Sequence, residues 1–245
     1  MSINNESINN KHISKYEYKK QHIFIGGGIA TGKTTMLNLL HEYMDYYTNT
    51  LFIKDYIDYD KEGIIKLKQL FNGLITDYEF QTYVLNCYEK HLNSPIYENA
   101  DFILWDRHPS EALEICCKDK NRLTKEERDK LKQRLEQIYR RYEIPLLTNN
   151  NVSIINIDTS RISVEIAQEA LINVFIHSAM LGITDGSIFV LLYCGDSETQ
   201  FKRIVKRGRQ VELEMYKKKE DLSKLNQCYI DFYVKLITEK TSSKK

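Results

Sequence analysis

Five short apolar segments alternate with longer amphipathic segments along the chain. The apolar segments are dominated by Ile, Val, Leu and Phe without strict alternation with polar residues, as expected of strands that are covered on both faces. They are Gln21–Gly26, Leu51–Asp55, Asp101–Asp106, Val152–Asp158 and Ser187–Cys194. Strands of this type, separated by helices, predict an α/β fold with a five-stranded parallel sheet flanked by helices.

Two of the intervening segments, residues 34–47 and 124–142, have the apolar spacing of a helix that packs one side on a sheet. The apolar positions are Leu37, Leu40, Met44 and Tyr47 in the first segment and Leu131, Leu135, Ile138 and Tyr142 in the second. Thr124 and Glu127 have the spacing of a capping box, in which each side chain bonds the other residue's backbone N–H. We therefore expect a helix over each segment.

The chain of 245 residues is longer than one typical domain but well short of two. Only three prolines occur, at positions 95, 109 and 145, and no Gly/Ser-rich linker marks a boundary. We expect a single domain over residues 21–239. The polar arm of residues 1–20 and the tail of residues 240–245 are expected to be disordered.

Charge is balanced, with 35 Lys and Arg against 34 Asp and Glu, so no overall field attracts nucleic acid or anionic lipid. The longest uncharged apolar run, Ser187–Cys194, is far shorter than the ~20 residues of a membrane helix. The N-terminus lacks the apolar stretch of a signal peptide, and the five cysteines show no Cys-x-x-Cys spacing. These features predict a cytoplasmic protein with free thiols, without a nucleic-acid or membrane partner.

The most specific motif is Gly27-Gly28-Ile29-Ala30-Thr31-Gly32-Lys33-Thr34, which matches the P-loop pattern between a predicted strand and a predicted helix. Its glycines allow successive backbone N–H groups to face phosphates, and the helix N-terminus adds a positive dipole. We expect Lys33 to contact the β- and γ-phosphates of ATP and the Thr34 hydroxyl to hold Mg²⁺. Thr35 completes the predicted ATP site. The alternative is a tight glycine turn that binds no ligand.

Polar residues follow two further strands, at the edge where an open parallel sheet binds its ligands. Asp106 and Arg107 would place a carboxylate near the metal and a guanidinium near the transferred phosphoryl group. Asp55 ends the second strand and is a candidate general base for an acceptor hydroxyl. The alternatives are a helix N-cap followed by an exposed arginine, and a loop aspartate comparable to Asp58 and Asp60.

Three arginines, Arg203, Arg207 and Arg209, follow the last predicted strand. Positions 203 and 207 share a helical face, and Gly208 allows Arg209 to leave the helix. This arrangement favours a lid that closes arginines over transferring phosphates. The alternatives are a solvated helix face and a basic patch for RNA or DNA.

Together these residues resemble the deoxynucleoside kinase family, and within it the herpesvirus-type thymidine kinases. The resemblance rests on the P-loop, on Asp106-Arg107-His108-Pro109 and on the three arginines with Glu212, and it covers roughly residues 20–120 and 185–235. It implies a P-loop kinase fold with an arginine-bearing lid. It also implies that ATP, with Mg²⁺ near Thr34 and Asp106, donates its γ-phosphoryl group to the 5′-hydroxyl of a deoxynucleoside held by Arg107.

The resemblance further implies a substrate pocket. Gln81 matches the glutamine that reads the base, and its amide can form two hydrogen bonds to a pyrimidine edge. Tyr88 stands where cytidine-preferring relatives carry arginine, and Ala112 stands where they carry the aspartate that binds the cytosine amine. Both positions indicate thymidine. Phe71 and Glu212 complete the predicted substrate set.

Four features depart from the family pattern. Asp55-Tyr56 stands in place of the Glu-Pro of the family's general base, and Cys116 stands where an aromatic ring stacks on the substrate base. Phe71 lies one residue out of register with the sugar-binding tyrosine and lacks its hydroxyl. Residues 152–174 resemble the strand and helix that usually close such kinases, but they precede the lid-bearing strand, either as an insertion or as a rearrangement.

Two other functions stay open. A nucleoside monophosphate kinase, here for thymidylate, shares the motifs but needs an additional positive clamp, which residues 83–88 do not offer. A catalytically silent nucleotide-binding or RNA-binding module is compatible with the shorter side chain of Asp55. Cellular-type thymidine kinases with a zinc-held lasso are excluded because their four-cysteine spacing is absent. The expected partner is a small-molecule nucleoside, and homodimer formation is left open.

Overall fold

The computed structural model describes residues 20–59, 61–119, 122–177 and 186–242. The predicted five-stranded parallel sheet is present, with the strand order β2-β3-β1-β5-β4. Its strands are β1 (Gln21–Gly27), β2 (Thr50–Ile53), β3 (Phe102–Asp106), β4 (Val152–Asp158) and β5 (Ser187–Tyr193). Their ends differ from the predicted ends by at most two residues.

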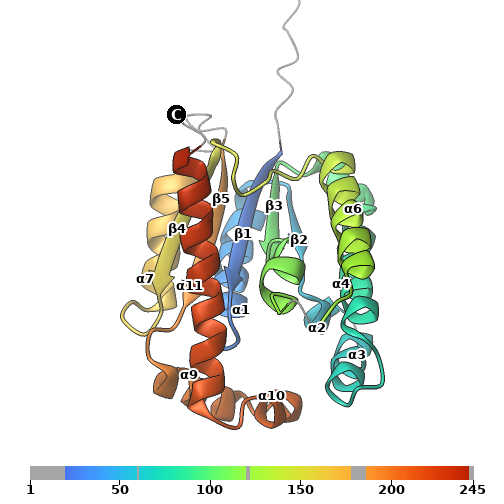
Figure 1. Cartoon of the computed structure of the whole chain (residues 1–245). Helices are drawn as coiled ribbons and strands as arrows, with labels where there is room; N and C mark the ends of the chain where they lie inside the picture. The colour runs from blue at the N-terminus through green and yellow to red at the C-terminus, as the bar shows by residue number, and fades with distance from the viewer. Residues whose placement is uncertain (1–19, 60, 120–121, 178–185, 243–245) are drawn as a thin grey trace, which may run out of the picture.

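Helices cover both faces of the sheet (Figure 1). One face carries α1 (Lys33–Tyr47) and α7 (Val164–Leu171), which continues into the π-helical segment η2 (Ile172–Ile176). The other face carries α3 (Lys61–Phe71), α4 (Asp77–Leu92), α6 (Lys125–Arg141) and α11 (Lys219–Ser242). The shorter elements are α2 (Tyr56–Tyr59), α5 (Pro95–Asn99), the π-helical η1 (Ala112–Cys116), α9 (Ser197–Arg207) and α10 (Gln210–Met215).

The alternation of side chains along the central strands divides the core into two layers. In β1, Ile23 and Ile25 belong to the layer under α1 and α7, whereas Phe24 belongs to the layer under α4, α6 and α11. In β5, Val190 belongs to the layer under α1 and α7, and Phe189 belongs to the opposite layer. Because both layers are apolar, the strands read as continuous apolar segments rather than as alternating ones.

The helix predicted over residues 124–142 is α6, and Thr124 is its N-cap. The Thr124 hydroxyl accepts a hydrogen bond from the backbone N–H of Glu127, and the Glu127 carboxylate accepts one from the backbone N–H of Thr124. The predicted capping box is therefore confirmed. A cap of this kind stabilises a helix by about 1 kcal/mol and fixes where it begins.

Strand β4 is an integral edge strand of the sheet, so residues 152–174 form part of the domain core. It pairs with β5 along its length, and α7 packs beside α1 on the same face. The crossover β4-α7-β5 runs across the sheet in the same direction as β1-α1-β2, with its helix on the same face. Both crossovers therefore have the same hand, as expected for parallel strands.

The C-terminal helix α11 extends through Ser242, three residues beyond the expected end of the domain at residue 239. Lys240 Nζ in this last turn donates a hydrogen bond to the carbonyl oxygen of Asn149 at 2.8 Å, so residues 240–242 are helical and not a disordered tail. The remaining segments for which disorder is expected, residues 1–19 and 243–245, lie outside the described residues. None of the described helices is long and apolar enough to cross a membrane.

Candidate active site

The loop between β1 and α1 is a tight turn in which glycine is required. Gly27 (φ 137°) and Gly32 (φ 97°) have backbone angles that favour glycine. A Cβ atom on Gly27 would lie only 2.0 Å from the carbonyl oxygen of Leu192 in β5. The predicted P-loop segment therefore has the close backbone packing that its glycines suggest, with the N-terminus of α1 directly after it.

Lys33 is buried at the start of α1. Its Nζ donates a hydrogen bond to the carbonyl oxygen of Gly28 at 2.9 Å, and the Thr31 hydroxyl donates to the same oxygen at 3.0 Å. Burial, together with the positive charge of Arg107, lowers the pKa of Lys33 to about 8. A phosphate ligand would compensate the burial of this ammonium group, so the position favours an anionic ligand.

A small cavity of about 60 Å³, which we call the phosphate cavity, lies against this loop. It is formed by the P-loop, by the segments that follow β2 and β3, and by the arginine-rich segment after β5, as expected for the carboxyl edge of a parallel sheet. The lining residues are Ile29, Ala30, Lys33, Thr34, Asp55, Ile57, Asp58, Asp106, Arg107, Arg207, Arg209 and Glu212. The predicted ATP residue Thr35 is exposed on α1 and is not among them.

Two of the carboxylates that line the phosphate cavity, Asp55 and Asp106, each have a buried Oδ1 atom that meets no hydrogen-bond partner among the described residues. Burial and the negative charge of Asp55 raise the pKa of Asp106 to about 7. An unpaired buried acceptor costs about 1–3 kcal/mol, which a bound cation would offset. Thr34 lines the same cavity. Oxygen ligands of this kind fit Mg²⁺, so the predicted pair Thr34 and Asp106 is suited to hold it.

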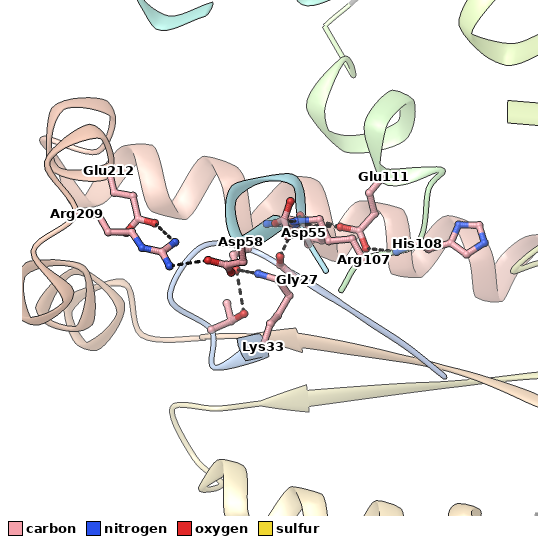
Figure 2. Close-up of polar contacts among 12 residues, drawn as sticks. Gly27, Lys33, Asp55, Asp58, Arg107, His108, Glu111, Arg209 and Glu212 are labelled. Atoms are coloured by element: carbon pink, nitrogen blue, oxygen red, sulfur yellow. Dashed lines mark hydrogen bonds and ion pairs between the residues drawn. The ribbon is translucent and has the colours of Figure 1, made fainter. Parts of the chain in front are cut away.

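Arg107 lies at the end of β3 with a backbone φ of 78°, a conformation that costs a non-glycine residue about 1–3 kcal/mol. Its Nε donates to Asp55 Oδ2 at 3.0 Å, and its Nη1 donates to Gly27 O at 2.8 Å and to Glu111 Oε2 at 3.2 Å (Figure 2). Nη1 also donates to the hydroxyl of Tyr229. Four acceptors from separate segments therefore hold this guanidinium.

A second, larger cavity of about 240 Å³ is also lined by Arg107, and we call it the large cavity. The predicted substrate residues Gln81 and Tyr88 from α4 and Ala112 from η1 line it. All three are buried, and most of the other lining side chains are aromatic or aliphatic. An apolar cavity with few polar groups suits a flat organic ligand with one hydrogen-bonding edge.

Phe71 does not contribute to the large cavity. It is 48% exposed, whereas Leu67 and Leu70 on the same helix α3 line the cavity. Consecutive helical residues point about 100° apart, so a shift of one position turns the ring away from the cavity. The expectation that Phe71 lies at the substrate is therefore wrong. Cys116 does line the cavity.

Two of the three predicted lid arginines reach the phosphate cavity. Arg207 Nη1 and Arg209 Nη1 donate to Glu212 Oε1 at 3.1 and 3.3 Å, and all three residues line the cavity. Glu212, predicted to bind substrate, thus lies with the arginines and not in the large cavity. Arg209 Nη2 also pairs with Asp58 Oδ1 at 3.2 Å, which connects α10 with α2.

Arg203 does not line the phosphate cavity, contrary to expectation. It lies one turn before Arg207 on α9, and its guanidinium donates to the Thr159 hydroxyl at 3.0 Å and to the Thr159 carbonyl oxygen at 2.7 Å. A contact of 3.5 Å reaches Ala30 O in the P-loop. Arg203 therefore connects the β4–α7 loop with the P-loop.

Sequence reasoning missed two buried residues that contact Arg107, namely Glu111 and Tyr229. The short spacing between Arg107 and Glu111 was an available signal, because a turn of this length can bring two side chains together. Tyr229 lies in α11, 122 residues from Arg107, and no motif surrounds it.

Comparison with known proteins gives a family match over part of the chain and a fold. Residues 23–144 match the family model described as deoxynucleoside kinase, whereas no curated protein matches the sequence. Among solved structures, deoxyadenosine kinase from M. mycoides with products dCMP and a flexible dCDP bound is 19% identical over 89% of this chain and 85% of that chain, with a TM-score of 0.51. The structure of that kinase with bound dATP is 19% identical over 89% of this chain and 87% of that chain, with a TM-score of 0.49.

The matched family region runs from β1 to just beyond α6. It contains the P-loop, Asp55, the cavity-lining helix α4 and Arg107, while the arginines after β5 lie outside it. The match does not extend to the herpesvirus-type branch that the sequence resembles. The chain has the P-loop kinase fold, and its residues 23–144 match the model of the deoxynucleoside kinase family.

Proposed function

We propose that the protein transfers the γ-phosphoryl group of ATP to the 5′-hydroxyl of a deoxynucleoside. The observation that carries this proposal is the position of Arg107, which lines both the phosphate cavity and the large cavity. A nucleoside in the large cavity would present its hydroxyl at this boundary, and the γ-phosphoryl group would approach it from the P-loop. The family match supports the same reaction class.

The phosphate cavity supplies the charges that phosphoryl transfer needs. Lys33, Arg207 and Arg209 line it and would bind the phosphate oxygens of ATP. Mg²⁺, held by Thr34 and Asp106, would neutralise charge that develops on the phosphoryl group. Catalysis in this scheme consists mainly of positioning and electrostatic stabilisation.

Asp55 is our candidate for the general base. Asp55 lines the phosphate cavity, its Oδ2 is bonded to Arg107, and its buried Oδ1 meets no partner among the described residues. Oδ1 would accept the proton of the attacking hydroxyl, and Arg107 would stabilise the negative charge on that oxygen. Aspartate thus takes the role expected of a glutamate, with the shorter side chain held in place by Arg107.

We propose thymidine as the preferred nucleoside. Gln81 is buried in the large cavity, where its amide would pair with a pyrimidine edge. Tyr88 and Ala112 line the same cavity and provide no charge for a cytosine amine. The carboxylate next to Ala112, that of Glu111, is bonded to Arg107 and Tyr229 and is therefore engaged.

The charges around the large cavity argue against a nucleoside monophosphate as acceptor. Two arginines line the cavity, and both have acidic partners among the described residues. Arg107 is paired with Asp55 and Glu111, and Arg122 Nε lies 3.3 Å from Asp77 Oδ2. Carboxylates therefore balance the charge of both arginines, which leaves no uncompensated positive charge for an acceptor phosphate among the described residues that line this cavity.

A coupled assay of ADP release tests the proposal, with Mg·ATP and each of thymidine, deoxycytidine, deoxyadenosine, deoxyguanosine and thymidylate. We expect turnover with nucleosides and the highest kcat/KM with thymidine. Turnover with thymidylate alone would show a monophosphate kinase. Binding of Mg·ATP without turnover of any acceptor would show a silent nucleotide-binding module.

A further inference from the structure

We propose that Tyr229 in the C-terminal helix α11 is a positioning residue for Arg107, acting together with Glu111. The proposal rests on the phosphoryl transfer proposed above. Its consequence is that the last helix of the chain supplies part of the active site, although it lies outside the segment that matches the family model.

The contacts form a closed triangle of buried groups. The Tyr229 hydroxyl donates to Glu111 Oε2 at 3.0 Å and accepts from Arg107 Nη1, which itself lies 3.2 Å from Glu111 Oε2. Tyr229 is 2% exposed and Glu111 is 1% exposed. Burial keeps the pKa of Tyr229 well above its ordinary value, so its hydroxyl carries the proton that it donates.

These contacts determine which part of the Arg107 guanidinium is available. Nε is engaged by Asp55, and Nη1 is engaged by Gly27, Glu111 and Tyr229. In the part of the chain that the structure describes, Nη2 has no hydrogen-bond acceptor, although the residue lines both cavities. A guanidinium is rigid and planar, so fixing Nε and Nη1 also fixes the direction of Nη2 toward an oxygen of the substrate.

The position of α11 is fixed by contacts on the same helical face. Leu225, one turn before Tyr229, lines the large cavity. Asn226 Nδ2 donates to Gln200 Oε1 at 2.7 Å and to Cys194 O at 3.0 Å, while Gln200 Nε2 donates to Ile29 O in the P-loop at 2.7 Å. The hydroxyl of Tyr229 is thus presented by a helix that is anchored to the P-loop.

The competing explanation is that Tyr229 only fills the core, because its ring belongs to the large apolar cluster under α11. Tyr229→Phe separates the two roles, since it keeps the ring and removes the hydroxyl. Tyr233→Phe is the matched control. Tyr233 lies one turn further along α11 and packs on the same cluster, but it lines neither cavity.

The full-length enzyme and both variants are compared by steady-state kinetics with Mg·ATP and the best nucleoside substrate. We expect Tyr229→Phe to lower kcat by about 10- to 100-fold with less than about threefold change in the KM for ATP. Tyr233→Phe should stay within about twofold of wild type. Glu111→Gln should reproduce the kcat loss, and the double variant should lose less than the product of the single losses, because both residues act through Arg107.

A kcat of Tyr229→Phe equal to that of Tyr233→Phe would overturn the positioning role while the proposed function stands. Equal losses of kcat and of thermal stability in both variants would indicate core packing and would overturn it as well. If Tyr229→Phe fails to fold, the Glu111→Gln result alone decides, since that side chain keeps its shape. Absence of turnover by the wild-type enzyme would overturn the proposed function itself.

Discussion

Arg107 illustrates how single residues of this site depend on their surroundings. Its backbone angle is unfavourable by itself, and the acceptors Asp55, Gly27 and Glu111 hold the side chain in place. These partners come from three different segments of the chain. A change at Asp55 or Glu111 should therefore act on the reaction more strongly than on the fold, whereas glycine at position 27 is also required by the backbone.

Asp55→Asn tests the general base at this scale. The amide oxygen can still accept from Arg107 Nε, but the side chain can no longer take a proton. We expect kcat to fall by about 100-fold or more, with unchanged affinity for Mg·ATP by calorimetry. Asp58→Asn, which removes only the partly exposed pair with Arg209, should cost less than about tenfold. Wild-type kcat in Asp55→Asn would assign the base to another group.

His108 predicts a dependence of stability on pH. Burial lowers the pKa of its ring to about 3, below the ordinary value of 6.5 in the unfolded chain. Between these values the unfolded state binds the additional proton, so the free energy of unfolding rises with pH over this window and falls as the solution is acidified. One such group contributes a slope of up to about 1.4 kcal/mol per pH unit.

Urea unfolding of wild type and His108→Gln between pH 4 and 7 measures this slope. The variant should show a flatter profile, with the remaining slope supplied by groups such as His91, whose pKa burial lowers to about 4. Parallel profiles for the two proteins would contradict the prediction.

At the scale of elements, the turn between β1 and α1 shows why a local motif is so informative. The P-loop pattern requires residues that can adopt its backbone angles, such as the positive φ of Gly27. The neighbouring strand β5 is a second reason for glycine at position 27, because it leaves no room for a Cβ atom. The capping box of α6 is local in the same sense, because Thr124 and Glu127 satisfy each other. Elements of this kind can be located from a few adjacent residues.

Gly27→Ala and Gly73→Ala separate the effect of the backbone angle from the effect of the contact with β5. Both residues have positive φ, but an added Cβ meets the Leu192 carbonyl oxygen at 2.0 Å in the first case and nothing within 4 Å in the second. We expect Gly27→Ala to destabilise the protein by about 3 kcal/mol or more and to impair ATP binding. Gly73→Ala should cost about 1–2 kcal/mol, the backbone strain alone. Equal decreases in the free energy of unfolding of the two variants, measured by chemical unfolding, would show that the contact with β5 is relieved easily.

At the scale of the whole molecule, the strand order brings distant segments to one edge of the sheet. The β4–α7 loop, the P-loop and α9 lie at this edge (Figure 1). Arg203 joins them through Thr159 and Ala30. Arg207 and Arg209 lie further along the same segment and line the phosphate cavity. Within this arginine-rich segment, Arg203 therefore connects structural elements, whereas Arg207 and Arg209 lie at the phosphate cavity.

Arg203→Ala and Arg209→Ala should separate stability from turnover. Loss of the charged hydrogen bonds to Thr159 predicts a destabilisation of about 1.5–3 kcal/mol for Arg203→Ala. Arg209→Ala removes ion pairs that are about one-third exposed, so its stability should change by less than about 1 kcal/mol, whereas kcat should fall by about tenfold or more. Wild-type stability with lost turnover in Arg203→Ala would instead assign that residue to the phosphates.

The five strands and the P-loop followed from the sequence because each depends on neighbouring residues. An apolar segment buried on both faces, or a glycine turn between a strand and a helix, has a local cause and therefore a local signal. The placement of Gln81 and Ala112 in one cavity followed only from the resemblance to a family.

The tertiary structure alone decided the rest. Phe71 does not line the large cavity, because a shift of one position along a helix turns a side chain by about 100°. Arg203 lies outside the phosphate cavity, because its guanidinium bonds Thr159. The edge position of β4 and the approach of Tyr229 to Arg107 depend on how the chain crosses the sheet. Contacts between residues 122 positions apart leave no periodic pattern in the sequence, because only packing brings the two segments together.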